Sequence, residues 1–240
     1  MKKIIIIFTF TICLNILILH QVFIHIHSKN SQPSHEILSE EVLQDENFKV
    51  EDYFNILTLS EKYGNKLESI VQLDPKVISY DNLRYLEILH VGFDGQIHKG
   101  ELIVNASISE EVLKIFREIY DVGFPIEKMK VISEYNNSDD ESMKDNNTSA
   151  FNFRTITNGA ELSNHAFGLA IDINPKINPY VSATSIFPEN ATEFVDRDQF
   201  TLGMIKKDEA VYKIFKKYGW VWGGDWDTIK DYQHFEKIIN

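Results

Sequence analysis

The sequence predicts a single α+β domain with a mainly antiparallel sheet flanked by helices, preceded by an N-terminal signal or anchor helix. Three observations support this. The 240-residue chain is 43% hydrophobic, which is enough apolar side chain to bury one core. Both period-2 and period-3.6 apolar patterns occur along it. These patterns do not alternate as in βαβ units, so we expect antiparallel strand pairing.

The first residues are typical of an export signal. The stretch "MKKIIIIFTFTICLNILIL" has two lysines and then an uncharged apolar run, Ile4–Leu19, as in the n-region and h-region of a leader. No small-x-small cleavage site follows. With Val22–Ile26 included, the run reaches the roughly 20 residues that span a bilayer. Residues 1–28 are therefore predicted to be a cleaved signal peptide or an uncleaved signal anchor, and both place the body outside the cytoplasm.

Cysteine content and charge exclude several classes of function. The one cysteine, Cys13, lies in the apolar run, so the body has no internal disulfide and no cysteine-based metal or nucleophile chemistry. No small residue precedes it as a lipid-attachment site would require. The formal net charge of −12 argues against a nucleic-acid partner.

Composition divides the rest of the chain into three parts. Residues 29–52 are polar and acidic, and we interpret them as a stalk or linker with a short helix after Ser39. The pattern becomes globular from about Tyr53. Residues 53–79 are assigned to an N-terminal extension, and residues 80–240 to the main domain.

The first elements of the main domain give the clearest signals. Residues 83–105, "LRYLEILHVGFDGQIHKGELIVN", are two apolar-rich runs around an Asp94-Gly95 turn, which predicts a β-hairpin. Residues 107–123 predict an amphipathic helix, capped by Ser107 or Ser109 and closed by Gly123. Its apolar positions follow helical spacing, and its first turn carries glutamates.

The following segments are more mixed. Residues 128–135 predict a short strand that leads into a long acidic loop, residues 136–154, and long loops in compact domains are often functional. The stretch "GLAIDI", residues 168–173, alternates like a strand, with Asp172 on the face opposite its isoleucines. Residues 204–219 predict a second helix, and residues 221–238 close the domain.

Two histidines and an aspartate in these segments suggest a metal site. His165 lies among small and apolar residues just before the predicted strand that carries Asp172, and His234 lies in "DYQHFE". Two imidazoles and one carboxylate form a ligand set that leaves one position of a tetrahedral zinc ion open. Asp231 precedes His234 by three residues and is placed to act as a general base. Asp225 in "GGDW" is its rival, which we interpret instead as a structural residue or as a partner of a ligand's free ring nitrogen.

These motifs together resemble one enzyme family. "SNHAFGLAID" followed by "WGGDW" and "DYQHFE" is similar to the M15 zinc peptidases, which include D-alanyl-D-alanine carboxypeptidases and dipeptidases of the VanY and VanX type and L-alanyl-D-glutamate endopeptidases. The similarity also takes in "NNTSAFNFR" and "IDINPKINPY", and spans roughly Tyr80 to Ile238. It implies a hedgehog/DD-peptidase-like fold. The chain before residue 80 has no counterpart in this resemblance, and no cell-wall-binding repeat is visible.

The resemblance also implies roles for individual residues. It implies one Zn²⁺ ion held by three ligands: His165, Asp172 and His234. Asp231 falls where the family has its catalytic acid/base. Arg154 matches the arginine that steadies the substrate carbonyl as negative charge develops. Ser163 matches a hydroxyl position that lines the substrate pocket.

The resulting hypothesis is a zinc metallopeptidase that acts outside the membrane on the peptide stems of peptidoglycan. Carboxypeptidase and endopeptidase specificity both remain open, and an inactive zinc-bound wall-binding or signalling module is the alternative from a different class. We expect a secreted or membrane-anchored monomer that contacts the membrane only through its N-terminal segment.

The remaining histidines and tryptophans have plainer interpretations. His90 and His98 flank the predicted hairpin turn and are expected to be structural or surface residues. The three tryptophans are expected in the core and in the pocket wall: Trp220, Trp222 and Trp226.

Overall fold

The computed structural model describes residues 37–43, 45–156 and 160–239. The predicted signal or anchor helix, residues 1–28, lies outside this range, as does the first part of the predicted stalk. Within the described ranges, no helix has both the length and the apolar character needed to cross a membrane.

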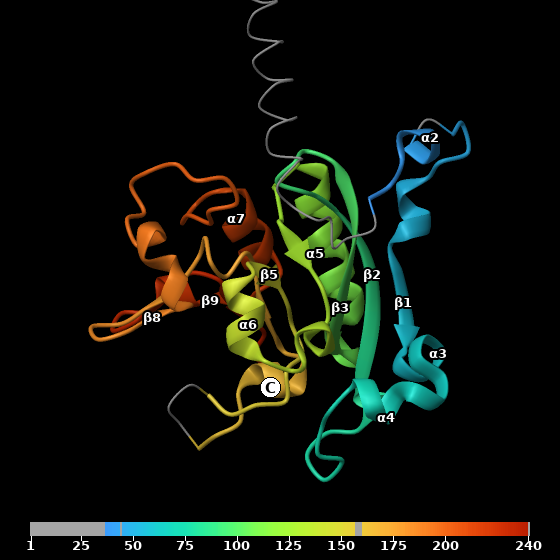
Figure 1. The fold of residues 1–240 in the computed structure, drawn as a ribbon, viewed down its shortest axis with the longest axis horizontal. Helices are drawn as coiled ribbons and strands as arrows, with labels where there is room; N and C mark the ends of the chain where they lie inside the picture. Colours follow the sequence, from blue (N-terminus) through green and yellow to red (C-terminus); the bar gives the residue numbers. More distant parts are fainter. Residues whose placement is uncertain (1–36, 44, 157–159, 240) are drawn as a thin grey trace, which may run out of the picture. The chain divides into compact units, whose positions relative to one another are not determined.

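A three-stranded antiparallel sheet forms the first half of the fold (Figure 1). Strands β2 (Leu83–Val91) and β3 (Ile97–Asn105) pair along their whole length, which confirms the predicted hairpin. The Asp94 side chain accepts a hydrogen bond from the Gln96 backbone and so stabilises the turn. Strand β1 (Asn55–Thr58) adds to the free edge of β2, so the predicted N-terminal extension contributes a strand to this sheet.

Helix α5 (Ser109–Asp121) is the predicted amphipathic helix. Its buried apolar side chains are those expected from the helical spacing: Val112, Ile115, Phe116 and Ile119. The predicted caps are wrong. Ser107 lies in a preceding 3-10 turn, Ala106–Ile108, whose capping side chain is Asn105. The helix therefore continues a turn that Asn105 has already capped.

The N-terminal residues of the described part pack on this sheet. Helix α2 (Glu40–Leu43) is the predicted short helix after Ser39, and just before it Leu38 is buried and donates a backbone hydrogen bond to Ile97. Helices α3 (Leu59–Tyr63) and α4 (Leu67–Ile70) follow β1.

The two faces of the β2–β3 hairpin are covered by different parts of the chain, because successive side chains of a strand point to opposite faces. One face, including Leu86 and Ile88, joins the main apolar cluster with α5. The other face, including Tyr85 and Ile103, packs against residues of the N-terminal extension. Burial on both faces explains why the two strands are apolar at consecutive positions.

The segment predicted as a strand and a long loop is more ordered than expected. Strand β4 (Lys128–Met129) is only two residues long and pairs in parallel with β5 (Asn147–Thr148). Helix α6 (Asp139–Lys144) lies between them, capped by Ser138. The loop prediction failed because side-chain amides, rather than an apolar face, hold this segment: the buried Asn147 amide exchanges hydrogen bonds with the Lys130 backbone.

Two small antiparallel sheets complete the fold. One has the order β6 (Ala170–Asp172), β11 (His234–Glu236), β9 (Val221–Trp222). The other has the order β10 (Lys230–Asp231), β7 (Tyr180–Val181), β8 (Ile186–Phe187).

The second predicted helix is α7 (Ala210–Lys217), which begins six residues later than the sequence suggested. Its buried residues Ile214 and Phe215 join the main apolar cluster together with α5 and the β6–β11–β9 sheet. Residues 37–240 thus form one compact unit of mixed α and β structure. The prediction of antiparallel strands with flanking helices is confirmed, but the strands form several small sheets rather than one.

Candidate metal centre

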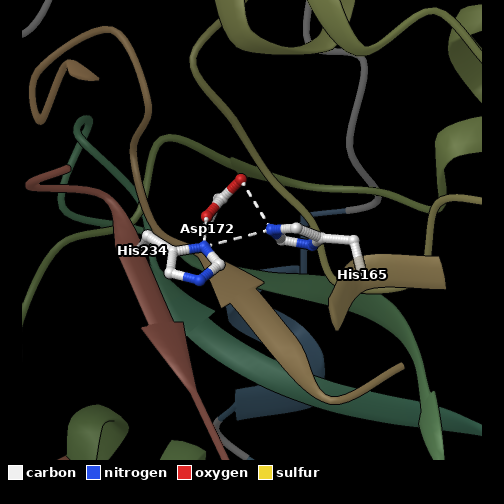
Figure 2. A group of neighbouring side chains, drawn as sticks. All are labelled: His165, Asp172 and His234. Atoms are coloured by element: carbon white, nitrogen blue, oxygen red, sulfur yellow. Dashed lines mark hydrogen bonds and ion pairs between the residues drawn. The ribbon is translucent and has the colours of Figure 1, made fainter. Parts of the chain in front are cut away.

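Strand pairing brings two of the predicted metal ligands together. His234 on β11 lies opposite Asp172 on β6 in an antiparallel register, and directly opposite side chains project from the same face. His165 comes from the 3-10 turn Asn164–Phe167 just before β6. Figure 2 shows the three side chains pointing toward one another. All three are buried, at 2% exposure for His165, 4% for Asp172 and 7% for His234.

The local sequence fixes the turn that carries His165. The hydroxyl of Ser163 caps the turn by accepting a hydrogen bond from the His165 backbone N–H at 3.3 Å. Gly168 ends the turn with a positive φ of 65°, and a Cβ there would lie 2.6 Å from the backbone nitrogen of Asn105. Glycine therefore allows the turn to pack against the end of β3, which holds His165 close to the sheet.

The ligand atoms lie at the spacing of a coordination shell. His165 Nε2 is 3.2 Å from His234 Nδ1 and 3.1 Å from Asp172 Oδ2, and His234 Nδ1 is 3.0 Å from Asp172 Oδ1. Zinc–nitrogen bonds of 2.0–2.1 Å in a tetrahedron give ligand–ligand separations of roughly 3.3 Å. This buried group of three can therefore hold a metal ion.

The outer nitrogen of each imidazole has its own partner. His165 Nδ1 is 2.6 Å from the Ala150 carbonyl oxygen, and His234 Nε2 is 3.3 Å from the Glu236 carboxylate. Both partners are acceptors, so each outer nitrogen carries the proton and each inner nitrogen presents a lone pair. Glu236 is itself held by the Asn164 amide at 2.6 Å. Two lone pairs and a carboxylate can then converge on one metal ion.

Without a metal ion, a proton takes the place of the cation. Burial alone would lower the pKa of His234, but its hydrogen bonds to Asp172 and Glu236 outweigh burial and raise that pKa to about 10. Burial alone would raise the pKa of Asp172, yet the two neighbouring histidines hold it well below its usual range. A proton on His234 therefore balances the carboxylate in the metal-free state, and a metal ion must displace it.

Asp231 lies at the edge of the same site, on β10. One of its carboxylate oxygens, Oδ1, is buried with no hydrogen-bond partner among the described residues. Burial and the Asp172 charge raise the pKa of Asp231 to about 6, while His234 acts in the opposite direction. Gly223 packs directly against this residue, and a Cβ at position 223 would lie 2.6 Å from the Asp231 carbonyl oxygen. The carboxyl group thus has the pKa expected of a general base near neutral pH.

Arg154 is held in place by residues of the preceding segment. Its Nε lies 3.1 Å from Asp139 Oδ2, and its Nη1 donates to the Thr155 carbonyl oxygen at 3.2 Å. The Asn152 amide donates to the other oxygen of Asp139 at 3.0 Å. Asp139 is the first residue of α6, so the helix that the sequence did not predict is what positions the guanidinium.

One cleft of about 490 Å³ contains every predicted site residue. These are the three ligand residues and three others: His165, Asp172, His234, Asp231, Arg154 and Ser163. The β7–β8 hairpin contributes Tyr180 and Phe187 to the wall, and the Trp226 ring lies 5.5 Å from the His234 ring, centroid to centroid. The other two tryptophans are buried in the core, so core and pocket-wall positions both occur, as expected.

Of the two interpretations of Asp225, the structure fits the structural one. Asp225 does not hold a ligand's ring nitrogen; it pairs with Lys207 at 3.0 Å and with Lys216 at 3.7 Å. The ring of His234 is held by Glu236, a role that was not predicted from the sequence. Alternation in "HFE" was an available signal, because residues two apart on a strand share a face.

The two hairpin histidines are structural, as expected, but His98 has a carboxylate partner that the spacing did not reveal. Its Nε2 lies 2.9 Å from Asp94 Oδ1. The His90 and His98 rings stack with their centroids 5.4 Å apart, and both side chains are buried. His90 also contacts the Ile126 carbonyl oxygen through Nδ1.

Comparison with known proteins agrees with this site. Residues 157–237 match a family model described as D-alanyl-D-alanine carboxypeptidase. That range includes the three ligand residues, Ser163 and Asp231, and it begins three residues after Arg154. No curated protein and no solved structure matches the chain. The matched region, about a third of the chain, is thus similar to a peptidase family, and it contains the buried metal-binding group.

Proposed function

We propose that this protein is a zinc-dependent metallopeptidase that hydrolyses D-amino-acid-containing peptide stems of peptidoglycan. One observation carries the proposal: the buried His165–Asp172–His234 group shares a cleft with the Asp231 carboxyl group and with the Arg154 guanidinium, which pairs with Asp139. The similarity of residues 157–237 to a D-alanyl-D-alanine carboxypeptidase model supports the peptide class of substrate.

The donor set favours zinc. Two neutral imidazoles and one carboxylate are typical of catalytic zinc sites, which keep a fourth position for water or substrate. Calcium and magnesium prefer oxygen ligands, and the chain has no cysteine among residues 14–240 to form a thiolate site. When bound at this position, zinc polarises a carbonyl group and lowers the pKa of coordinated water toward 7.

The chain's own residues then have separate tasks. Asp231, with a pKa raised to about 6, accepts a proton from the attacking water and later delivers it to the leaving amine nitrogen. The Arg154 guanidinium stabilises the negative charge that develops on the carbonyl oxygen. Glu236 and the Ala150 carbonyl hold the two imidazoles in the required tautomers.

Two specificities remain in competition. A D-alanyl-D-alanine carboxypeptidase is favoured by the description of the matching family model. An L-alanyl-D-glutamate endopeptidase is favoured by the charges of the cleft: among its described lining residues Arg154 is the one lysine or arginine, and Asp139 already pairs with it. A carboxypeptidase needs a cation for the terminal carboxylate of its substrate, whereas an endopeptidase does not.

The proposal extends to the location of the enzyme. The leader-like sequence of residues 1–28 supports a secreted or membrane-anchored enzyme of the cell wall, and we expect it to act as a monomer. The net charge of −12 supports a partner other than nucleic acid.

The test is to incubate the zinc-loaded full chain with muropeptides of defined stem length and to record product masses. Loss of one alanine from a pentapeptide stem would identify a carboxypeptidase, and release of the stem after L-Ala an endopeptidase. Asp231→Asn should abolish either product, while Asp227→Asn, four residues earlier and exposed, should leave it unchanged. No mass change with the wild type would reject the peptidase and favour the inactive wall-binding module.

A further inference from the structure

Gln233 has a buried side chain that the chain itself does not satisfy. The residue lies between Asp231 and His234, is 3% exposed and lines the cleft. Its Oε1 is buried without a hydrogen-bond partner in the described part of the chain. Its Nε2 contacts the thioether sulfur of Met143 at 3.7 Å, and a thioether is a weak acceptor.

The backbone of Gln233 is held in place by strand pairing. The Gln233 carbonyl oxygen accepts a hydrogen bond from the Ile173 N–H at 3.0 Å, immediately after β6 ends at Asp172. His234, the next residue, begins β11. Gln233 therefore cannot move away from the cleft without disturbing the pairing that places two of the ligand residues.

An unsatisfied buried amide costs free energy, so such groups are rare in native proteins and call for an explanation. A core role does not explain this one, because no donor in the described part of the chain reaches its oxygen. A second unsatisfied acceptor, Asp231 Oδ1, lines the same cleft. Two such acceptors on residues that line one cleft suit a ligand that brings its own N–H donors.

The chemistry of Gln233 indicates which kind of donor it meets. A carboxylate would suit an ammonium group, whereas a neutral amide oxygen suits a neutral donor such as a peptide N–H. The Gln233 amide also lies close enough to Asp231 to lower the pKa of that carboxyl group. Its nitrogen interacts with Met143 and Asp231, which leaves its oxygen for the substrate.

We propose that Gln233 is a specificity-determining residue whose Oε1 accepts a hydrogen bond from a backbone N–H of the peptide substrate, at an amide bond next to the scissile bond. This inference rests on the proposed peptidase function. It predicts that the unsatisfied amide becomes satisfied only when a peptide is bound.

The first test separates this role from a structural one. Gln233→Met keeps an unbranched side chain of similar length and removes both polar atoms. We expect kcat/KM for stem peptides to fall about tenfold, the effect of one neutral hydrogen bond, while the thermal midpoint stays the same or rises. Gln199→Met is the matched control, because Gln199 is exposed and bonds to Asp196. A lower midpoint with unchanged kcat/KM would overturn the inference.

The second test asks whether the substrate N–H is the partner. Stem peptides are made with an ester in place of each amide that neighbours the scissile bond, which removes one N–H at a time. One of these esters should lower kcat/KM about tenfold with the wild type and much less with Gln233→Met. Equal losses in both proteins for every ester would contradict the inference. If the wild type cleaves not even the all-amide peptide, the proposed function itself fails and this inference falls with it.

Discussion

His234 and Asp172 occupy directly opposed positions on β11 and β6, and the Nδ1 of one lies 3.0 Å from the Oδ1 of the other. The pair is buried, and His165 Nε2 lies 3.2 Å from the same nitrogen. Backbone pairing thus sets the geometry of the site before any ion is present. The protein does not need to order a loop in order to bind a metal, and the predictions below follow from that preorganisation.

Metal affinity should increase with pH. In the metal-free protein the pKa of His234 is about 10, so a metal ion must displace one proton from it at neutral pH. The apparent affinity for zinc should rise about tenfold per pH unit between pH 6 and 8. Competition titrations against a chelator of known affinity, corrected for the chelator's own protonation, would measure this. A pH-independent affinity would show that His234 is not protonated in the metal-free state.

Stability of the metal-free protein should show the opposite trend. The pKa of His234 is raised above its ordinary value of 6.5 by its partners. The resulting stabilisation is fully present below pH 6.5 and is lost as the pH rises toward 10. Urea unfolding of the metal-free protein should give a lower free energy of unfolding at pH 9 than at pH 7. The zinc-loaded protein should lose much less, and an equal loss in both would count against this account.

Glu236→Gln should weaken metal binding without removing a ligand. The Glu236 carboxylate accepts from His234 Nε2 and so fixes the ring orientation and raises its basicity. Loss of such a partner reduces metal affinity about 10- to 100-fold. Zinc affinity at constant pH is the measurement, and Glu193→Gln, at an exposed position, is the control. An unchanged affinity would mean that the ring is held by packing alone.

The acid limb of the activity profile should report Asp231. Its pKa is raised to about 6, and the group must be deprotonated to act as a base, so kcat/KM should rise with pH and level off above that value. A bound cation favours the carboxylate, which places the limb of the zinc-loaded enzyme at or below pH 6. Asp231→Asn should reduce kcat by about 10²- to 10⁴-fold and remove the limb. A limb that persists in the variant would belong to another group.

Asp139→Asn should lower catalysis by releasing Arg154. Asp139 is the ionised partner of the Arg154 Nε at 3.1 Å, and an amide holds a guanidinium less firmly. We expect kcat to fall roughly tenfold with little change in the melting temperature. Asp140→Asn is a close control, because the adjacent Asp140 is exposed and pairs with Lys144 on the same helix. Equal effects of the two substitutions would attribute the loss to α6 rather than to Arg154.

The sequence predicted those elements whose signals are local. The β2–β3 hairpin follows from an Asp-Gly turn between apolar runs, and α5 from an apolar stripe with helical spacing. Helix α6 was missed because it is short and polar, and because buried Asn side chains rather than apolar contacts fix the strands around it. Its cap, Ser138, was visible, but a cap without an apolar stripe does not predict a helix.

The site residues were predictable to different degrees. The predicted metal ligands are of residue types that commonly bind metals, and they lie in motifs typical of metal sites. The structure brings all three together: His165, Asp172 and His234. Glu236 and Asp139 act through His234 and Arg154, and their roles depend on strand register and on a helix that the sequence did not predict. Gln233 carried no signal at all, since only burial without a partner distinguishes it from any other glutamine.

A crystal structure of the zinc-loaded protein, with anomalous data collected at the zinc absorption edge, tests the central claim most directly. We predict one strong anomalous peak, within about 2.0–2.2 Å of His165 Nε2, His234 Nδ1 and one oxygen of Asp172. A peak elsewhere on the molecule, or none at this position despite a stoichiometric zinc content, would contradict the account.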